Sequence, residues 1–389
     1  MTRPPRVNQS AARELLVDLV SIRSPSGEED AAARRLVEFF RAHGREAWLD
    51  AVGNVRAPAD DGLLLTSHVD TVPGDLPVEI TASEYDDEDP LRGGNALWGR
   101  GSVDATGSLA AMAVAAVRTG VSFAGVVGEE TDSRGARHLV ADRTAVPGAV
   151  VNGEPSGWDG ITLGYRGFLA GTYAGSTPAG HSSRPVANAI EQAMAWWSRV
   201  ERALADAVEE PDAVFESVTT KPVAVRGGLA DDGQSVTARM DVQFRVPPGL
   251  GADSQTGAVE QVREVVEGVL ETGTLEWNEP IPPVMVSART PLARAFRVAI
   301  RDAGGEARLL RKTGTSDMNL YAVAWDCPMV TYGPGDAALD HAPNEHLALE
   351  EYDRSIAVLE GVANRLLETE TQRNADREAE AGPIGGDRS

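Results

Sequence analysis

The segment 63–73, LLLTSHVDTVP, contains His68 and Asp70 directly after a run of leucines that is typical of a buried strand. On an extended chain, residues two apart point to the same side. The carboxylate of Asp70 can therefore hold one nitrogen of the His68 ring while the other nitrogen binds a metal ion. A strand-end histidine beside a surface aspartate explains the H-x-D pattern equally well, so the choice depends on the rest of the chain.

Acidic residues follow three further strand-like runs. Asp104 lies in LWGRGSVDATG, Glu129 and Glu130 lie in FAGVVGEETD, and Glu154 ends GAVVNGEP. Strands alternate with helices here, which predicts an α/β sheet with helices on both faces, and ligands gather at the carboxyl ends of such strands. We therefore expect these side chains to meet at one edge of the sheet. So many carboxylates in one place would repel each other without a cation, which favours a divalent metal site.

The charge balance narrows the class of protein. Lys+Arg number 36 against 59 Asp+Glu, a net charge of −23, and Lys221 and Lys312 are the only lysines. Such a surplus disfavours nucleic acid as a partner. Self-repulsion is weak in molar salt, where the Debye length is ~3 Å, so we expect adaptation to a salt-rich cytoplasm; an acidic enzyme from an ordinary cell is the alternative. The acidic run 86–89 is expected to be a solvated loop.

No run of the chain approaches the ~18 apolar residues of a membrane span, and the start MTRPPRVNQS lacks a signal peptide's apolar core. These features predict a cytoplasmic protein with no membrane partner.

The pattern of elements predicts two domains. Residues 1–164 and 283–368 are expected to form an α/β domain with a mixed sheet flanked by helices. Residues 165–282 are expected to form an inserted α+β domain, because their order is β-α-β-β-α-β, as in ferredoxin-like folds. Residues 369–389 lack apolar periodicity and are expected to be a disordered tail.

Six ordered motifs, SHVDTVPG, GRGSVDATG, GEETDSRG, NGEP, GHSSRP and DHAPNEH, resemble those of the zinc aminoacylase and carboxypeptidase family. That family includes acetylornithine deacetylase and succinyl-diaminopimelate desuccinylase. The segments NGEPSGWDGITLGYRG and KTGTSDMN resemble most closely the branch that releases lysine or ornithine from the amino-group carrier protein LysW. One departure is Thr106 in DATG, where many relatives carry another residue.

The resemblance implies a two-metal catalytic domain, with two divalent ions, zinc by preference and cobalt as a substitute. Asp104 would bridge the two ions, and Asp70 would orient His68. Glu129 would act as the general base and not as a ligand. The five implied metal ligands are His68, Asp104, Glu130, Glu154 and His341.

The resemblance also implies roles in the inserted domain, which would serve as lid and dimerisation domain. His181 would stabilise the oxyanion in a partner subunit's site, although a turn histidine next to two serines is the alternative. Apart from the resemblance, Arg245 at the end of the strand DVQFRV could clamp the carboxylate of the substrate, and Thr315, in the second part of the catalytic domain, is a further candidate for substrate binding. A salt-bridged surface arginine is an equally good interpretation of Arg245.

The implied partners are a small acidic amino-group carrier protein, as substrate, and a second copy of the chain in a homodimer. Cations that could receive an acidic carrier are Arg166, Arg184, Arg226, Arg311 and Lys312. A non-catalytic scaffold of the same fold is disfavoured because every ligand and the base are present. A deacetylase, desuccinylase or dipeptidase of the same family stays an alternative, since its ligands and base would be identical.

Overall fold

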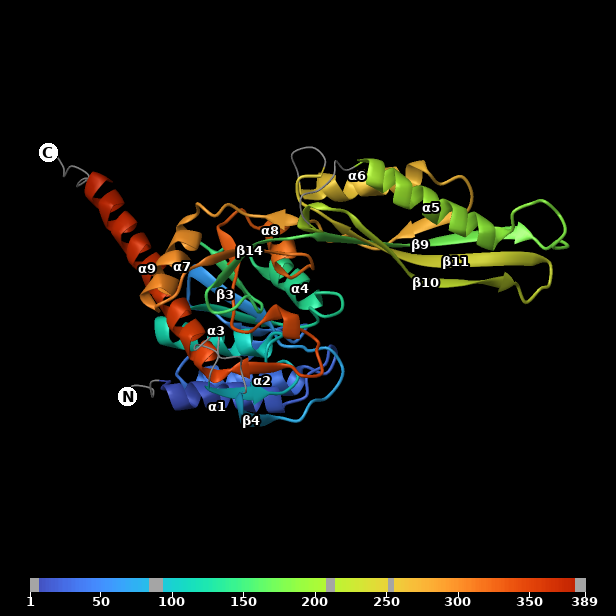
Figure 1. Cartoon of the computed structure of the whole chain (residues 1–389). Coiled ribbons are helices and arrows are strands. Elements are labelled where there is room, and N and C mark those ends of the chain that lie inside the picture. Colours follow the sequence, from blue (N-terminus) through green and yellow to red (C-terminus); the bar gives the residue numbers. More distant parts are fainter. Residues whose placement is uncertain (1–6, 84–93, 208–213, 251–254, 382–389) are drawn as a thin grey trace. The chain divides into compact units, whose positions relative to one another are not determined.

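The computed structural model (Figure 1) describes residues 7–83, 94–207, 214–250 and 255–381. The predicted solvated loop at 86–89 lies outside these residues. The chain forms two compact units. The first contains the described residues up to Leu163, Val286–Leu310 and the chain from Ala324, and the second contains Gly164–Met285 and Arg311–Val323.

The first unit contains most of the helices. These are α1 (Gln9–Ser21), α2 (Asp30–Ala42), α3 (Thr106–Thr119), α4 (Arg134–Asp142), α7 (Pro291–Asp302), the short 3₁₀ helix η2 (Ala337–Leu339) and α9 (Leu349–Ala381). Its strands are β1 (Trp48–Leu49), β2 (Val55–Ala57), β3 (Asp60–His68), β4 (Glu79–Ser83), β5 (Gly94–Trp98), β6 (Val121–Val126), β7 (Val150–Gly153), β8 (Gly160–Tyr165), β14 (Arg308–Lys312), β15 (Met329–Thr331) and β16 (His346–Ala348). The unit boundaries fall inside β8 and β14.

The main sheet has the order β1-β2-β6-β3-β7-β15-β8, with β14 and β13 (Val284–Met285) both pairing with β8. Strands β6, β3, β7 and β15 run parallel, whereas the flanking strands are antiparallel, so the predicted mixed sheet is confirmed. The leucines 63–65 are buried in β3, as expected for a strand covered on both faces. Because β6, β3 and β7 are parallel neighbours, their carboxyl ends meet at one edge.

The strand before Asp104 does not belong to this sheet. It is β5, the central strand of a separate three-stranded sheet with the order β16-β5-β4. Asp104 instead comes near the main sheet because α3 begins at Thr106 and packs against β3, β6 and β7. The small residues of α3 allow this close packing. Gly107 meets a different constraint, because a Cβ there would lie 2.4 Å from the carbonyl oxygen of Ser102, in the loop that carries Asp104.

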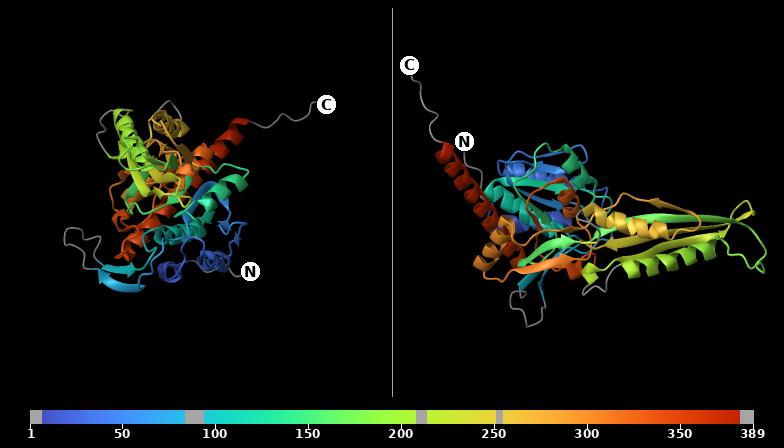
Figure 2. Two further views of the ribbon diagram at one scale, coloured as in Figure 1. Left: turned by 90° about the vertical axis from the view of Figure 1, so that its right-hand side faces the viewer. Right: turned by 90° about the horizontal axis from the view of Figure 1, so that it is seen from above.

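The second unit has a four-stranded antiparallel sheet covered by two helices. Its elements are β9 (Gly167–Pro178), α5 (Ala189–Ala207), the 3₁₀ helix η1 (Val214–Glu216), β10 (Thr219–Leu229), β11 (Ser235–Val246), α6 (Gln255–Gly268), β12 (Thr274–Trp277) and α8 (Met318–Ala324). The strand order β10-β11-β9-β12 is that of a ferredoxin-like fold, as predicted. Helices α5 and α6 lie on one face of the sheet (Figure 2), where Tyr173 stacks on Trp196 with ring centroids 4.8 Å apart.

The segment Arg311–Val323 belongs to the second unit, although the sequence predicted it in the first. The Asn319 side chain donates hydrogen bonds to the carbonyl oxygens of Arg166 and Pro282 at 3.2 and 2.7 Å. These bonds attach the segment to the start and end of the inserted domain. Both acceptors are main-chain atoms, so no pattern of side chains in the sequence predicts these hydrogen bonds.

Helix α9 continues to Ala381, whereas the sequence predicted disorder from residue 369. The added stretch is rich in Glu, Ala and Arg, which favour helix, and extending an existing helix avoids the cost of nucleation. Apolar periodicity was therefore the wrong criterion for this stretch. Among the described residues, no helix combines the length and apolarity that a membrane crossing requires.

Candidate metal centre

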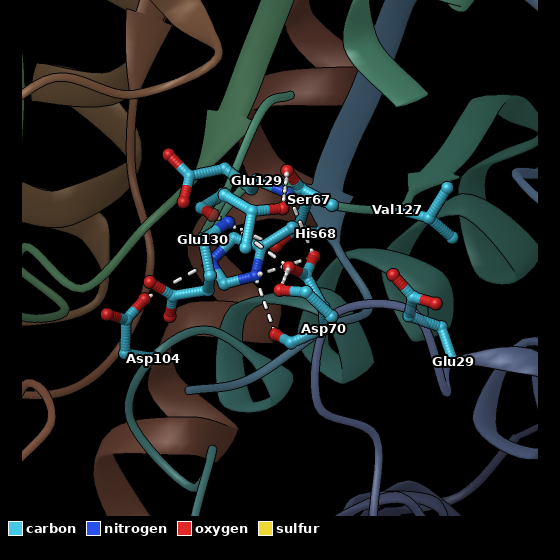
Figure 3. Close-up of polar contacts among 12 residues, drawn as sticks. Glu29, Ser67, His68, Asp70, Asp104, Val127, Glu129 and Glu130 are labelled. Atoms are coloured by element: carbon cyan, nitrogen blue, oxygen red, sulfur yellow. Dashed lines mark hydrogen bonds and ion pairs between the residues drawn. The ribbon is translucent and has the colours of Figure 1, made fainter. Parts of the chain in front are cut away.

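Three parallel strands deliver acidic and histidine side chains to one edge of the main sheet. Strand β3 ends at His68, and the loop after β6 carries Glu129 and Glu130 (Figure 3). Strand β7 is followed by Glu154. In the register of the sheet, His68 pairs with Val126 of β6. The structure therefore brings these predicted residues together at the edge where the sequence predicted them.

Asp104 faces two histidines with its two oxygen atoms. Its Oδ1 lies 3.2 Å from His68 Nε2, and its Oδ2 lies 3.1 Å from His341 Nε2. Glu154 Oε1 lies 4.0 Å from His68 Nε2, and Glu130 Oε2 lies 3.1 Å from His341 Nε2. Two ligand groups result, His68–Asp104–Glu154 and Asp104–Glu130–His341, each with ligand atoms within 4.8 Å of one another.

Glu129 belongs to a third such group, with His68 and Glu130. It is partly buried, as is Glu130. Its proximity to His68 suits a base beside a metal and equally an additional ligand.

The electrostatics of the group fit a divalent cation. Burial would raise the pKa of Asp104, but hydrogen bonds from His341 and His68 hold it below its ordinary value. Hydrogen bonds to Asp104 and Glu130 raise the pKa of His341 to about 10. Burial opposes protonation of His68, yet its bond to Asp104 and the nearby carboxylates raise its pKa well above the usual value. The carboxylates thus favour a positive charge beside the Nε2 atoms of His68 and His341. A set of nitrogen and oxygen ligands suits zinc or cobalt.

Asp70 orients His68 with a different atom from the one predicted. His68 Nδ1 lies 2.8 Å from the main-chain carbonyl oxygen of Asp70, whereas the nearest carboxylate oxygen is 3.7 Å away. The carboxylate is fully buried and accepts hydrogen bonds from the backbone N–H groups of Glu129 and Glu130, both at 3.1 Å. The Ser26 hydroxyl donates a third bond at 2.6 Å. The prediction for H-x-D required the strand to continue to Asp70, but β3 ends at His68, so the two side chains do not point to the same side of a strand.

The turn 24–29 holds the loop that carries Glu129 and Glu130, a role that the sequence analysis missed. Ser26 reaches this loop through Asp70, and the buried carboxylate of Glu29 accepts a hydrogen bond from Arg134 Nη2 at 2.5 Å (Figure 3 shows Glu29 and Asp70). The segment SPSGEED predicts a turn between helices. Nothing in that segment distinguishes Glu29, which precedes α2 and is buried, from the exposed acidic residues beside it.

His341 has an unusual backbone for a residue with a side chain. Its φ is 61°, in the left-handed region that few residues other than glycine adopt, although histidine, asparagine and aspartate do so more often. Half of its side chain is exposed, in contrast to His68, of which 1% is exposed. The second ligand group therefore lies at the surface of the first unit, and the first lies beneath it.

The predicted site residues that the structure places in the second unit lie near two opposite ends of its sheet. Arg245 Nη1 donates to Thr315 Oγ1 at 3.1 Å, and its guanidinium lies 4.7 Å from the centre of the Phe168 ring. His181 lies in an exposed loop just after the far end of β9, with its Nδ1 2.8 Å from Ser183 Oγ. The structure thus brings Arg245 and Thr315 together and leaves His181 at the opposite end.

One of the cations predicted to receive an acidic carrier, Arg166, does not lie at the surface. Arg166 is buried and donates to the carbonyl oxygens of Thr313, Val214 and Ser217 and to Thr219 Oγ1, at 2.7–3.3 Å. Burial accordingly lowers its pKa. Its role is structural, because it joins separate segments of the second unit.

The other predicted cations of this unit differ in their surroundings. Arg311 pairs with Glu216 at 3.0 Å, which offsets its charge. Arg184 and Arg226 are exposed.

Comparison with known proteins identifies the class. The family model described as peptidase family M20/M25/M40 matches residues 64–365, and the chain belongs to this family. The chain is 37% identical over 379 residues to a LysW-lysine hydrolase of Deinococcus radiodurans, covering 93% of this chain and 99% of that protein. It is 29% identical over 347 residues to a LysW-lysine/LysW-ornithine hydrolase of Saccharolobus islandicus, covering 87% and 91%.

A solved structure supports the fold. A dinuclear metal-binding peptidase of the M20 family from Bacillus subtilis superimposes with a TM-score of 0.65 at 15% identity, covering 93% of this chain and 99% of that one.

Proposed function

We propose that this chain is a metal-dependent amide hydrolase that releases lysine or ornithine from the γ-glutamyl end of the amino-group carrier protein LysW. The observation that carries the proposal is the pair of ligand groups that share Asp104, with Glu129 beside them. The substrate class rests on the similarity over almost the whole chain to the LysW-lysine hydrolase.

Five side chains would hold two divalent ions, zinc by preference with cobalt as a substitute: His68, Asp104, Glu130, Glu154 and His341. Bound cations would supply Lewis-acid polarisation of the scissile carbonyl and lower the pKa of a water molecule. The main-chain carbonyl of Asp70 accepts the Nδ1 proton of His68 and so leaves Nε2 as the ligand atom.

Glu129 would act as the general base. It would take a proton from water as the new C–O bond forms at the glutamyl carbonyl carbon. It would then give that proton to the nitrogen of the amino acid as the C–N bond breaks. The products are the carrier's carboxylate and the free amine. Asp70 keeps Glu129 in position through the backbone N–H group of that residue.

A comparison of substrates tests the proposal. Metal-loaded enzyme in molar salt should hydrolyse carrier-linked lysine or ornithine with kcat/KM at least ~10-fold above N-acetylornithine and succinyl-diaminopimelate, since the carrier adds binding contacts that small substrates lack. A small acyl amino acid as the better substrate would refute the carrier assignment and leave the two-metal hydrolase intact.

Exposed arginines of the second unit are proposed to receive the acidic carrier. The double substitution Arg184→Glu with Arg226→Glu should raise KM for the carrier several-fold and leave KM for N-acetylornithine unchanged, because only the carrier is large and acidic. Arg294→Glu, at an exposed position of α7 in the first unit, is the matched control. Equal effects on both substrates would show that these arginines act on the fold and not on the carrier.

A homodimer is proposed because His181 and Arg245 are too far apart to serve one substrate from one chain. Phe168 pairs with Arg245, and Pro178, three residues before His181, pairs with Ser235 at the far end of β9. Ten residues of strand span roughly 34 Å. His181 of one copy would therefore complete the site of the other.

The edge strand β10 offers a surface for this pairing of copies. Its Val223 and Val225 are more than half exposed, at 52% and 57%. Sedimentation analysis should give a dimer, and a monomer of full activity would exclude this arrangement.

A salt-rich cytoplasm is proposed as the compartment of this protein, and the net charge of −23 supports that proposal.

A further inference from the structure

Arg100 and Glu345 form an ion pair in the first unit that none of the roles above uses. Arg100 Nη1 lies 2.8 Å from Glu345 Oε2, and the Glu345 side chain is fully buried, with 14% of the Arg100 side chain exposed. Burial of such a pair is unfavourable unless further hydrogen bonds satisfy both groups. The partners of this pair therefore indicate what it does.

The pairing of β5 with β16 brings the two residues together. His346 pairs with Trp98, so the residue before β16 and the residues after β5 lie side by side. The chain after β5 leads to Asp104, and the chain before β16 comes from His341. The antiparallel ladder thus brings together two loops that carry metal ligands.

Glu345 is bonded to the backbone of the Asp104 loop. Its Oε1 accepts hydrogen bonds from the backbone N–H groups of Val103, at 2.9 Å, and Asp104, at 3.1 Å. The bond to Asp104 holds the main chain of the residue whose side chain faces both histidines. A rotation of this peptide group would move both carboxylate oxygens together.

Arg100 is bonded to two other loops. Its Nε donates to the carbonyl oxygen of Gly74 at 3.0 Å, in the loop that follows His68 and Asp70. Its Nη1 donates to the carbonyl oxygen of Ala342 at 3.3 Å, the residue after His341. The fork of the guanidinium makes these bonds and the bond to Glu345 at the same time, which a lysine ammonium does not reproduce.

We propose that Arg100 and Glu345 are positioning residues that fix Asp104 relative to His341, so that its carboxylate faces both His68 and His341 before any cation binds. Neither residue belongs to the ligand groups, and both act through the main chain. The inference rests on the metal ligands proposed above. Residues that orient ligands in this way typically contribute 10- to 100-fold to metal affinity.

Titration with Co²⁺ tests this inference, with calorimetry for affinity and visible absorption for the coordination of the ion. Glu345→Gln replaces one carboxylate oxygen by an amide nitrogen that faces either Arg100 or the two backbone N–H groups. We expect it to bind two Co²⁺ ions, with the dissociation constant of at least one raised ~10- to 100-fold and an altered absorption spectrum. Arg100→Lys should have a smaller effect in the same direction.

Asp353→Asn is the matched control. Asp353 accepts hydrogen bonds from Arg13 of α1, so the substitution also removes an arginine–carboxylate pair but changes none of the three loops. We expect a lower unfolding temperature of the metal-free protein and unchanged Co²⁺ affinity.

Three outcomes would contradict the proposal in distinguishable ways. Wild-type affinity and spectrum in both Glu345→Gln and Arg100→Lys would overturn the inference alone, even if both variants unfold at lower temperature. Failure of the unchanged protein to bind two Co²⁺ ions would overturn the metal centre and the inference with it. If circular dichroism shows that Glu345→Gln does not fold, unchanged Co²⁺ affinity in Arg100→Lys overturns the inference.

Discussion

Replacing Asp70 by asparagine tests whether its carboxylate holds the loop of Glu129 and Glu130 or the ring of His68. Oδ2 accepts from Ser26 and Glu130, and Oδ1 accepts from Glu129. The single oxygen of asparagine can keep the first two bonds, but its NH₂ group then faces the Glu129 N–H. One buried N–H without an acceptor costs about 1–3 kcal/mol, and loss of charge assistance in the other two bonds costs about 1 kcal/mol each.

We therefore expect Asp70→Asn to lower the free energy of unfolding by about 4 kcal/mol, measured by urea denaturation of the metal-free protein. It should also lower kcat by ~10²-fold at saturating metal, because the backbone of the base is displaced. Metal content should stay near that of the unchanged protein, since the main-chain carbonyl still holds His68. Ser26→Ala should act in the same direction by about 1 kcal/mol, and Ser21→Ala, which removes a local helix bond, serves as its control.

Unchanged stability of Asp70→Asn together with loss of one metal equivalent would contradict this role of the carboxylate. That result would mean that the carboxylate acts on the imidazole after all, across the 3.7 Å that separate them in this structure.

Further predictions concern the base, the oxyanion contact, a buried arginine and salt. Glu129→Gln should lower kcat by ~10²-fold or more with unchanged metal content, because it removes proton transfer only; loss of a metal equivalent would exchange its role with that of Glu130. His181→Ala should lower kcat by ~10²-fold, and mixed dimers with Glu129→Gln should regain one active site in two; no recovery would argue that His181 acts within its own chain. Arg166→Ala should destabilise the second unit by about 3 kcal/mol in thermal or urea unfolding, since it leaves buried carbonyl oxygens without donors; a change below about 0.5 kcal/mol would contradict this role. Raising KCl to molar concentration should raise the unfolding temperature, because it screens the net charge of −23; a fall would contradict salt adaptation.

The edge of the main sheet was predictable because each of its signals is local in the sequence. Apolar runs that end in His68, Glu129 and Glu154 mark strands whose carboxyl ends converge once the strands are parallel neighbours. The ferredoxin-like order was predictable for the same reason. In β11 the buried residues alternate, from Ala238 to Val246, with a period of two.

The unpredicted parts depend on atoms that the sequence does not display. The acceptors of Arg166 and Asn319 are mostly carbonyl oxygens, and the donors to Asp70 and Glu345 are mostly backbone N–H groups. Every residue carries a carbonyl oxygen and every residue except proline carries a backbone N–H, so only the tertiary structure shows which of them face a given side chain. The same limit explains why the segment Arg311–Val323 was predicted in the wrong unit.

If His341 holds a metal as proposed, its left-handed backbone restricts which ligand atoms this position can offer. Asparagine, aspartate and histidine are the residues with side chains that adopt such a φ most readily, and each of the three carries a metal-binding atom. Glycine also fits this backbone but would remove the ligand, whereas replacement by asparagine or aspartate would keep a ligand and exchange nitrogen for oxygen. Oxygen ligands favour harder ions such as manganese and magnesium over zinc. Position 341 is thus where the proposed centre could exchange a nitrogen ligand for an oxygen ligand without backbone strain, whereas at His68, on a regular strand, the backbone does not favour residues with a metal-binding atom over others.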